Sequence, residues 1–85
     1  MGNLQTPAVR AKLVDIFSAV LKRPVGATEH VVRAEEKKWD SLLHVELVFV
    51  VEDAFDISFS PEDLERLVSL DAFAEVVASK QAGTS

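Results

Sequence analysis

Ser41 is the residue of this sequence whose type and position favour covalent chemistry. It stands between Asp40 and Leu42 in the stretch KKWDSLLHVEL, where a charged segment gives way to a mostly apolar one. If Asp40 caps a helix, Ser41 occupies the first turn, with its hydroxyl outside the core and near unpaired backbone N–H groups. A phosphate ester there would be stabilised by the positive end of the helix dipole. The alternative is that Asp40 and Ser41 only begin a helix, and spacing alone favours that plainer interpretation.

His44 raises a second possibility, because it follows Ser41 by three residues and would be its neighbour on a helix surface. A serine and a histidine so placed could form a hydrolase dyad. The sequence offers no obvious third group to orient the imidazole and no glycine-rich turn for an oxyanion site, and 85 residues leave little room for a pocket. We therefore expect that the chain is not an enzyme and that His44 is half-buried. No role is predicted for His30.

The length of 85 residues predicts a single domain over 1–85, with a core over about 7–78 and a flexible tail over 80–85. The sequence has no cysteine, so its core must come from packed aliphatic side chains rather than disulfides. No apolar run approaches the length of a membrane span, and the first residues lack the apolar segment of a secretory signal. These features predict a cytoplasmic protein without a membrane partner, and we expect a monomer.

The charge is distributed unevenly along the chain. Residues 1–39 carry seven bases and four acids, a net charge of +3, and residues 40–85 carry two bases and ten acids, a net charge of −8. A surface this negative repels phosphate backbones and attracts basic proteins. The sequence therefore disfavours nucleic acid as a partner.

Apolar residues at three- and four-residue spacing predict a first helix over about 7–22, with Thr6 and Pro7 as its cap and first turn. Pro24 and Gly26 end this periodicity, and the segment 23–39 has no sustained pattern. Connections of this length in a compact domain are uncommon and often functional. We expect a packed loop that contains a helical turn.

The helix predicted over 41–55 has two different faces at about 100° per residue. One face is the expected core and consists of His44, Leu47, Val48, Val51 and Phe55. The other mixes apolar and acidic side chains: Leu42, Val45, Glu46, Phe49, Asp53 and Asp56. An apolar strip rimmed by acids is typical of a partner-binding surface. The alternative is a central helix that is buried on most sides.

Two more helices complete the predicted fold. Ser60, followed by Pro61 and two acids, begins a short helix whose core contacts would come from Leu64 and Leu67, and Ser69 begins the last helix. The buried stripe of the last helix would be Leu70, Phe73, Val76 and Val77. The sequence thus predicts an all-α fold, a small four-helix bundle of three main helices and one short helix, with a long loop between helices one and two.

The chain resembles an acyl carrier protein from Trp39 to Val77. The resemblance lies in Asp40-Ser41-Leu42, followed by Val45-Glu46-Leu47-Val48, Glu52, Phe55-Asp56-Ile57 and Pro61-Glu62-Asp63-Leu64. The short motif is matched together with its context, a long loop before it and an acid-flanked apolar helix after it.

This resemblance implies that a phosphopantetheinyl transferase esterifies Ser41 with 4'-phosphopantetheine from coenzyme A, with Asp40 and Leu42 flanking the attachment point. The thiol of the arm would then carry acyl or aminoacyl groups as thioesters between loading, condensing or tailoring enzymes with basic docking patches. The positions that match the partner-recognition residues of the family are Leu42, Val45, Glu46, Phe49, Glu52 and Asp53.

The details of the motif favour one kind of carrier. Lys38, Trp39 and Asp40 stand where peptidyl carriers usually have two glycines, and Leu43 stands where carriers of fatty-acid synthesis commonly have a second acid. The chain resembles free-standing carriers of specialised, polyketide-type pathways more than it resembles either of these two kinds. The competing hypothesis is an acidic helical interaction module without a covalent cofactor, which would have the same fold and the same acidic face.

Overall fold

The computed structural model describes residues 5–82, with side chains over 8–81. The described chain forms α1 (Gln5–Leu21), the short 3-10 helix η2 (Arg33–Glu35), α2 (Ser41–Phe55), α3 (Pro61–Arg66) and α4 (Leu70–Ala82). These residues contain no strand. The prediction of an all-α bundle with a long loop after the first helix is confirmed, and so is the helical turn inside that loop. None of the described helices is long and apolar enough to cross a membrane.

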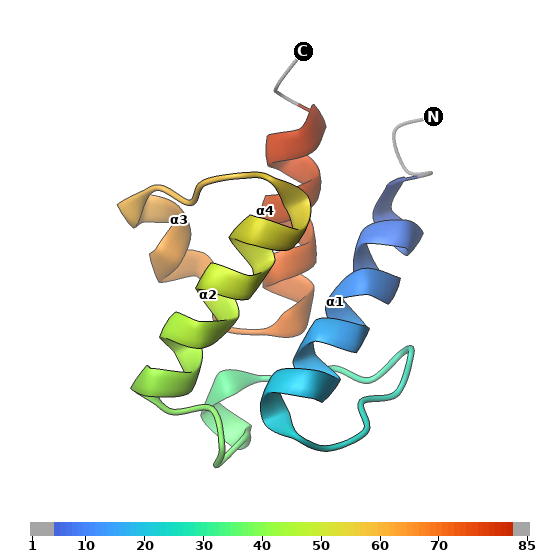
Figure 1. Cartoon of the computed structure of the whole chain (residues 1–85), viewed down its shortest axis with the longest axis vertical. Helices are drawn as coiled ribbons and strands as arrows, with labels where there is room; N and C mark the ends of the chain where they lie inside the picture. Colours follow the sequence, from blue (N-terminus) through green and yellow to red (C-terminus); the bar gives the residue numbers. More distant parts are fainter. Residues whose placement is uncertain (1–4, 83–85) are drawn as a thin grey trace.

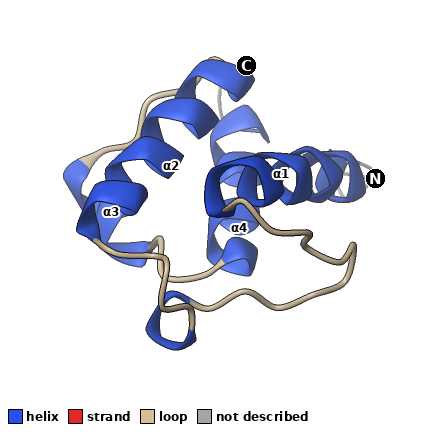
Figure 2. Ribbon diagram, turned by 60° about the horizontal axis from the view of Figure 1, so that its bottom comes forward, coloured by secondary structure: helices blue, strands red, loops and turns tan. Residues whose placement is uncertain are grey.

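The three long helices lie side by side, and the loop closes one end of the bundle. In Figure 1, α1 runs downward while α2 and α4 run upward, so that α1 is antiparallel to both of its neighbours. The short α3 packs on α4. Figure 2 shows the loop passing below the end where α1 stops and α2 and α4 begin, with η2 inside it. Ser41 therefore lies at the end of the bundle that the loop covers.

An aromatic cluster occupies the centre of the core. The Phe73 ring of α4 meets the Phe17 ring of α1 edge to face, with the centroids 5.4 Å apart, and it also contacts Phe59 at 6.1 Å. Phe17 in turn meets the Trp39 ring edge to face at 5.3 Å. Edge-to-face pairs at such distances add to the stabilisation that burial provides. The cluster therefore joins α1, α4 and the last part of the loop.

The predicted helix starts at Asp40, Ser60 and Ser69 are all confirmed. Ser60 Oγ accepts from the Asp63 N–H at 3.1 Å and Asp63 Oδ2 accepts from the Ser60 N–H at 2.9 Å, which is a complete capping box before Pro61. Ser69 Oγ accepts from the N–H of Ala72 at 3.0 Å. These caps depend on neighbours in the sequence, so local patterns were enough to find them.

Three predicted details of the helices are wrong. Thr6 and Pro7 lie inside α1, which already includes Gln5, so Thr6 is not its cap. Leu64 is 38% exposed, and of the two predicted core contacts only Leu67, the C-cap residue that follows α3, is buried. The flexible tail was predicted from residue 80, but α4 continues to Ala82. Residues 83–85 of that tail lie outside the described residues.

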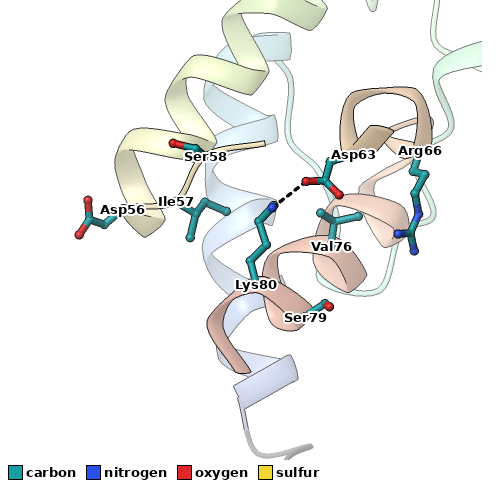
Figure 3. A pocket seen from close by; sticks show the side chains of 8 residues that line it. All are labelled: Asp56, Ile57, Ser58, Asp63, Arg66, Val76, Ser79 and Lys80. Carbon is teal, nitrogen blue, oxygen red and sulfur yellow. Dashed lines mark ion pairs between the residues drawn. The ribbon is translucent and has the colours of Figure 1, made fainter. Parts of the chain in front are cut away.

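An ion pair joins the last turns of α4 to α3. Lys80 Nζ lies 2.7 Å from Asp63 Oδ2, so the last turns of α4 are tied to the start of α3 (Figure 3). The hydrogen bond from Lys80, together with the one from the Ser60 N–H, lowers the pKa of Asp63 to about 2. The Asp63 carboxylate thus both accepts the hydrogen bond that caps α3 and pairs with Lys80 of α4.

Because Phe73 lies in the core and Phe49 on the surface, truncation to alanine should destabilise the fold by different amounts at the two positions. We expect Phe73→Ala to lower the free energy of unfolding by about 3–5 kcal/mol, since it leaves a cavity at the centre of the cluster. Phe49→Ala should cost less than about 1 kcal/mol, because that ring is 65% exposed. Urea denaturation followed by far-UV circular dichroism measures both. If Phe73→Ala does not fold, Phe73→Leu should still cost more than Phe49→Ala, and equal costs would contradict this assignment.

Candidate functional site

Ser41 is the first residue of α2 and is exposed. Asp40 is the N-cap, in an extended conformation, and its Oδ1 accepts from the Leu43 N–H at 2.9 Å. The side-chain hydroxyl of Ser41 has no hydrogen-bond partner among the described residues. The N–H groups of Ser41 and Leu42 belong to the first turn and have no intrahelical acceptor. The Ser41 hydroxyl is therefore accessible beside two free backbone donors.

Trp39 is bound to His44 directly beneath this start of α2. The indole Nε1 donates to His44 Nδ1 at 3.0 Å, and the two rings stack with an interplanar angle of 24°. Trp39 is only 3% exposed, and His44 also contacts Phe73 edge to face. Because Nδ1 accepts this hydrogen bond, the neutral imidazole carries its proton on Nε2. Trp39 thus packs at the end of the bundle where α2 begins.

These contacts leave His44 poorly placed as a general base for Ser41. Burial lowers the pKa of His44 and the positive charge of Arg33 lowers it further, so that the imidazole is neutral at pH 7. One ring nitrogen of that imidazole is bonded to Trp39 and the other holds the proton. Within residues 5–82 no hydrogen bond joins Ser41 to His44. The geometry therefore gives no support to the hydrolase dyad.

The outer face of α2 carries the exposed apolar strip that the helical periodicity predicted. Leu42 is 77% exposed, Val45 51% and Phe49 65%. Glu46 and Asp53 are exposed beside them. Only Leu47 and Val51 of α2 are buried, so the alternative of a helix covered on most sides is wrong. The strip begins one residue after Ser41.

Glu52 differs from the other predicted partner-binding residues. It is half-buried, and its Oε2 accepts from the backbone N–H of Phe59 at 2.7 Å. This carboxylate therefore stabilises the link between α2 and α3 and is less available to a partner than Glu46 or Asp53.

Arg10 fastens the middle of the loop to the bundle. Its guanidinium donates to the carbonyl oxygens of Ala27 at 3.1 Å and Glu29 at 2.7 Å, and it pairs with the Asp71 carboxylate of α4. The other oxygen of Asp71 bonds His30 Nδ1 at 2.7 Å. Hydrogen bonds from His30 and Arg10 lower the pKa of Asp71. This cluster could not be predicted from local sequence patterns, because its members are far apart along the chain.

Arg23 fastens the two ends of the loop to each other. It pairs with Glu29 at 2.9 Å and with Glu36 at 2.8 Å, and the Glu29 carboxylate also accepts from the Gly26 N–H at 3.0 Å. The backbone adds two further bonds to the start of α4: the Arg33 N–H donates to Val68 O and the Leu70 N–H donates to Val31 O, both at 2.9 Å. The loop that leads to Ser41 is thus held at several points.

A hollow of about 560 Å³ lies at the other end of α2, some 20 Å from Ser41 by the rise of the helix. Ile57 and Val76 line it, and the Lys80–Asp63 ion pair spans it, as Figure 3 shows. The paired charges neutralise each other. Because of its distance from Ser41, this hollow has no part in the chemistry of the site.

Within the described part of the chain, no group of three or more His, Cys, Asp or Glu side chains could hold a metal ion. Comparisons of the sequence and the fold with family models, with curated proteins and with solved structures returned no match. The function of the chain is therefore inferred from the residues and geometry of this site.

The hydrogen bond between Trp39 and His44 should report the protonation of His44. Because an imidazolium cannot accept from the indole N–H, acidification breaks this bond. The pKa of His44 is lowered in the folded state, so the free energy of unfolding should be constant above the unfolded pKa of about 6.5 and decrease as the pH falls below it. Fluorescence of the single tryptophan, recorded from pH 8 to pH 4 together with urea denaturation, measures both changes.

The two histidines of the chain provide matched variants for this experiment. His44→Phe retains an aromatic ring but no acceptor, and it should abolish the pH-dependent change in Trp39 fluorescence. His30→Phe should leave that change intact, since His30 is bonded to Asp71. A transition that persists in His44→Phe would contradict the assignment.

Proposed function

We propose that this chain is an acyl carrier protein and that Ser41 is the attachment point of a 4'-phosphopantetheine arm. The observation that carries the proposal is the exposed Ser41 hydroxyl at the capped start of α2, next to an exposed strip of apolar residues. The motif Asp40-Ser41-Leu42, in which the chain resembles this family, supports the same residue. Once attached, the arm would supply a terminal thiol that carries acyl or aminoacyl groups as thioesters.

The start of α2 suits a phosphate ester. In the attachment reaction Ser41 Oγ would form a bond to the phosphorus of the pantetheine phosphate, and the bond from that phosphorus to the adenosine bisphosphate of coenzyme A would break. The serine proton would leave to a base of the transferase. Free N–H groups of the first turn and the helix dipole would then stabilise the anionic ester. Asp40 keeps the helix start in place through its bond to the Leu43 N–H.

Partner enzymes would dock on the outer face of α2. Leu42, Val45 and Phe49 supply apolar contact area next to Ser41, and Glu46 and Asp53 supply negative charge at its edge. A net charge of −8 over residues 40–85 would steer basic docking patches toward this face. Brief and salt-sensitive contacts suit a carrier that must leave each enzyme, since tethering already raises the local concentration of its cargo.

The proposal includes a monomeric carrier in the cytoplasm that serves enzymes of a polyketide-type pathway. A second candidate function is a helical interaction module without a covalent cofactor. The exposure of Leu42 and Phe49 supports this candidate as much as it supports a carrier, because an apolar strip can bind a partner whether or not Ser41 is modified. Covalent modification of Ser41 separates the two.

The chain should gain the mass of one phosphopantetheine arm when it is incubated with coenzyme A and a broad-specificity phosphopantetheinyl transferase. Intact-protein mass spectrometry measures the gain. Ser41→Ala should gain nothing, whereas Ser58→Ala, which removes another exposed serine, should be modified like the wild type. A wild-type chain that stays unmodified while a known carrier is converted would overturn the proposal and favour the interaction module.

Reversal of a charge at the edge of the strip should slow the same transferase. We expect Asp53→Lys to lower kcat/KM roughly five- to tenfold at low ionic strength, the effect of about 1 kcal/mol of lost attraction. The difference should shrink at about 1 M salt, where the Debye length is about 3 Å. Glu75→Lys makes the same charge change at an exposed position of α4 and should have little effect. Equal rates for Asp53→Lys and the wild type at low salt would contradict docking on this face.

A further inference from the structure

A second hollow lies between α1 and α2, on the side of α2 that faces α1. Its volume is about 500 Å³. Besides Lys12, the side chains that line it are Asp15, Ile16, Ala19, Val20, Glu46 and Val50. Ile16 and Val20 form a floor that is 9% and 8% exposed, and Val50 is 36% exposed beside them. We call this hollow the α1–α2 groove.

The α1–α2 groove is separate from the proposed attachment site. Val50 follows Ser41 by nine residues, which at about 100° per residue places the two on opposite sides of α2. Figure 1 shows α1 and α2 side by side and antiparallel, with α1 on one side of α2 and α3 on the other. A molecule in the groove would leave the Ser41 side of α2 accessible.

The rim of the groove carries uncompensated negative charge. Asp15 and Glu46 are both exposed, and neither forms an ion pair among the described residues. Lys12 forms no ion pair with them, because its Nζ donates to the carbonyl oxygen of Ala54 at 3.1 Å and lies 5.3 Å from the centroid of the Phe55 ring, and the lining keeps a net charge of −1. The only cation at the groove is therefore directed toward the last turn of α2.

We propose that the α1–α2 groove is a docking surface for a basic amphipathic helix of a partner protein, on the side of α2 opposite Ser41. Two antiparallel helices leave a furrow that accepts the side-chain ridge of a third helix. Apolar residues of that helix, three and four positions apart, would contact Ile16, Val20 and Val50. Lysine or arginine residues beside them would pair with Asp15 and Glu46. The helix would bind whether or not Ser41 is modified, and it would compete for Glu46 with an enzyme docked on the strip of Leu42, Val45 and Phe49.

A synthetic leucine–lysine peptide of about 14 residues, designed as an amphipathic helix of about four turns, is the probe for this surface. It is titrated into the ¹⁵N-labelled chain, and amide shifts are recorded by NMR. We expect the largest shifts in the mid-α1 and mid-α2 residues that line the groove, with saturable binding. A peptide of the same composition in scrambled order, which has no apolar face, should bind at least fivefold more weakly.

Variants test the charge and the floor of the groove separately. Asp15→Lys should weaken the peptide at least fivefold, and Glu75→Lys, the same kind of charge reversal on α4, should change the affinity less than twofold. Ala19→Trp fills the groove and should also abolish binding. Both groove variants should still be modified at Ser41, so a failure here would be distinguishable from a failure of the carrier proposal.

Three results would overturn the proposal. The first is a set of shifts confined to the Leu42, Val45 and Phe49 strip. The second is an affinity that Asp15→Lys leaves unchanged. The third is the same pattern of shifts when the chain alone is concentrated, which would identify a second copy as the occupant.

Discussion

The buried indole of Trp39 joins the parts of the molecule on which the site depends. It meets Phe17 of α1 edge to face, lies against Phe73 of α4 and donates its N–H to His44 of α2. Ser41 follows Trp39 by only two residues. The position of the exposed hydroxyl therefore depends on apolar contacts in the core, on the hydrogen bond between Trp39 and His44, and on the Asp40 cap between them in the sequence.

The long loop contains little secondary structure, and hydrogen bonds and ion pairs of arginine side chains hold it in place. Arg10 bonds two loop carbonyl oxygens and the Asp71 carboxylate, and Arg23 joins Glu29 to Glu36. Charge-assisted bonds of a planar, multidentate donor can hold irregular backbone in a single arrangement. The positive charge that the sequence concentrates before residue 40 is thus partly used inside the fold. The acidic second half, by contrast, presents several carboxylates to the solvent.

The sequence predicted those features that depend on neighbouring residues. Asp40 and Ser60 were recognised as caps because the acceptor and the N–H it binds are three residues apart, and Phe49 was placed on the surface by helical periodicity. Contacts between distant segments were not predicted. Nothing near Arg10 indicates its bond to α4, and nothing near Lys80 indicates its ion pair with a carboxylate 17 positions earlier. The groove between α1 and α2 was missed for the same reason, since it exists only once both helices are packed.

Fewer residues are buried in α2 than in α1 or α4, and this affects the dynamics of the domain. Only Leu47 and Val51 anchor this helix fully, while α1 contributes six buried apolar residues and α4 five. Because apolar burial is the main stabilising term, detaching α2 requires less free energy than separating α1 from α4. Its amide hydrogens should exchange with solvent through a local opening that leaves the α1–α4 pair intact. A partner that binds α2 would thus act on the most easily displaced of the three long helices, whose adjustment during recognition would cost little free energy.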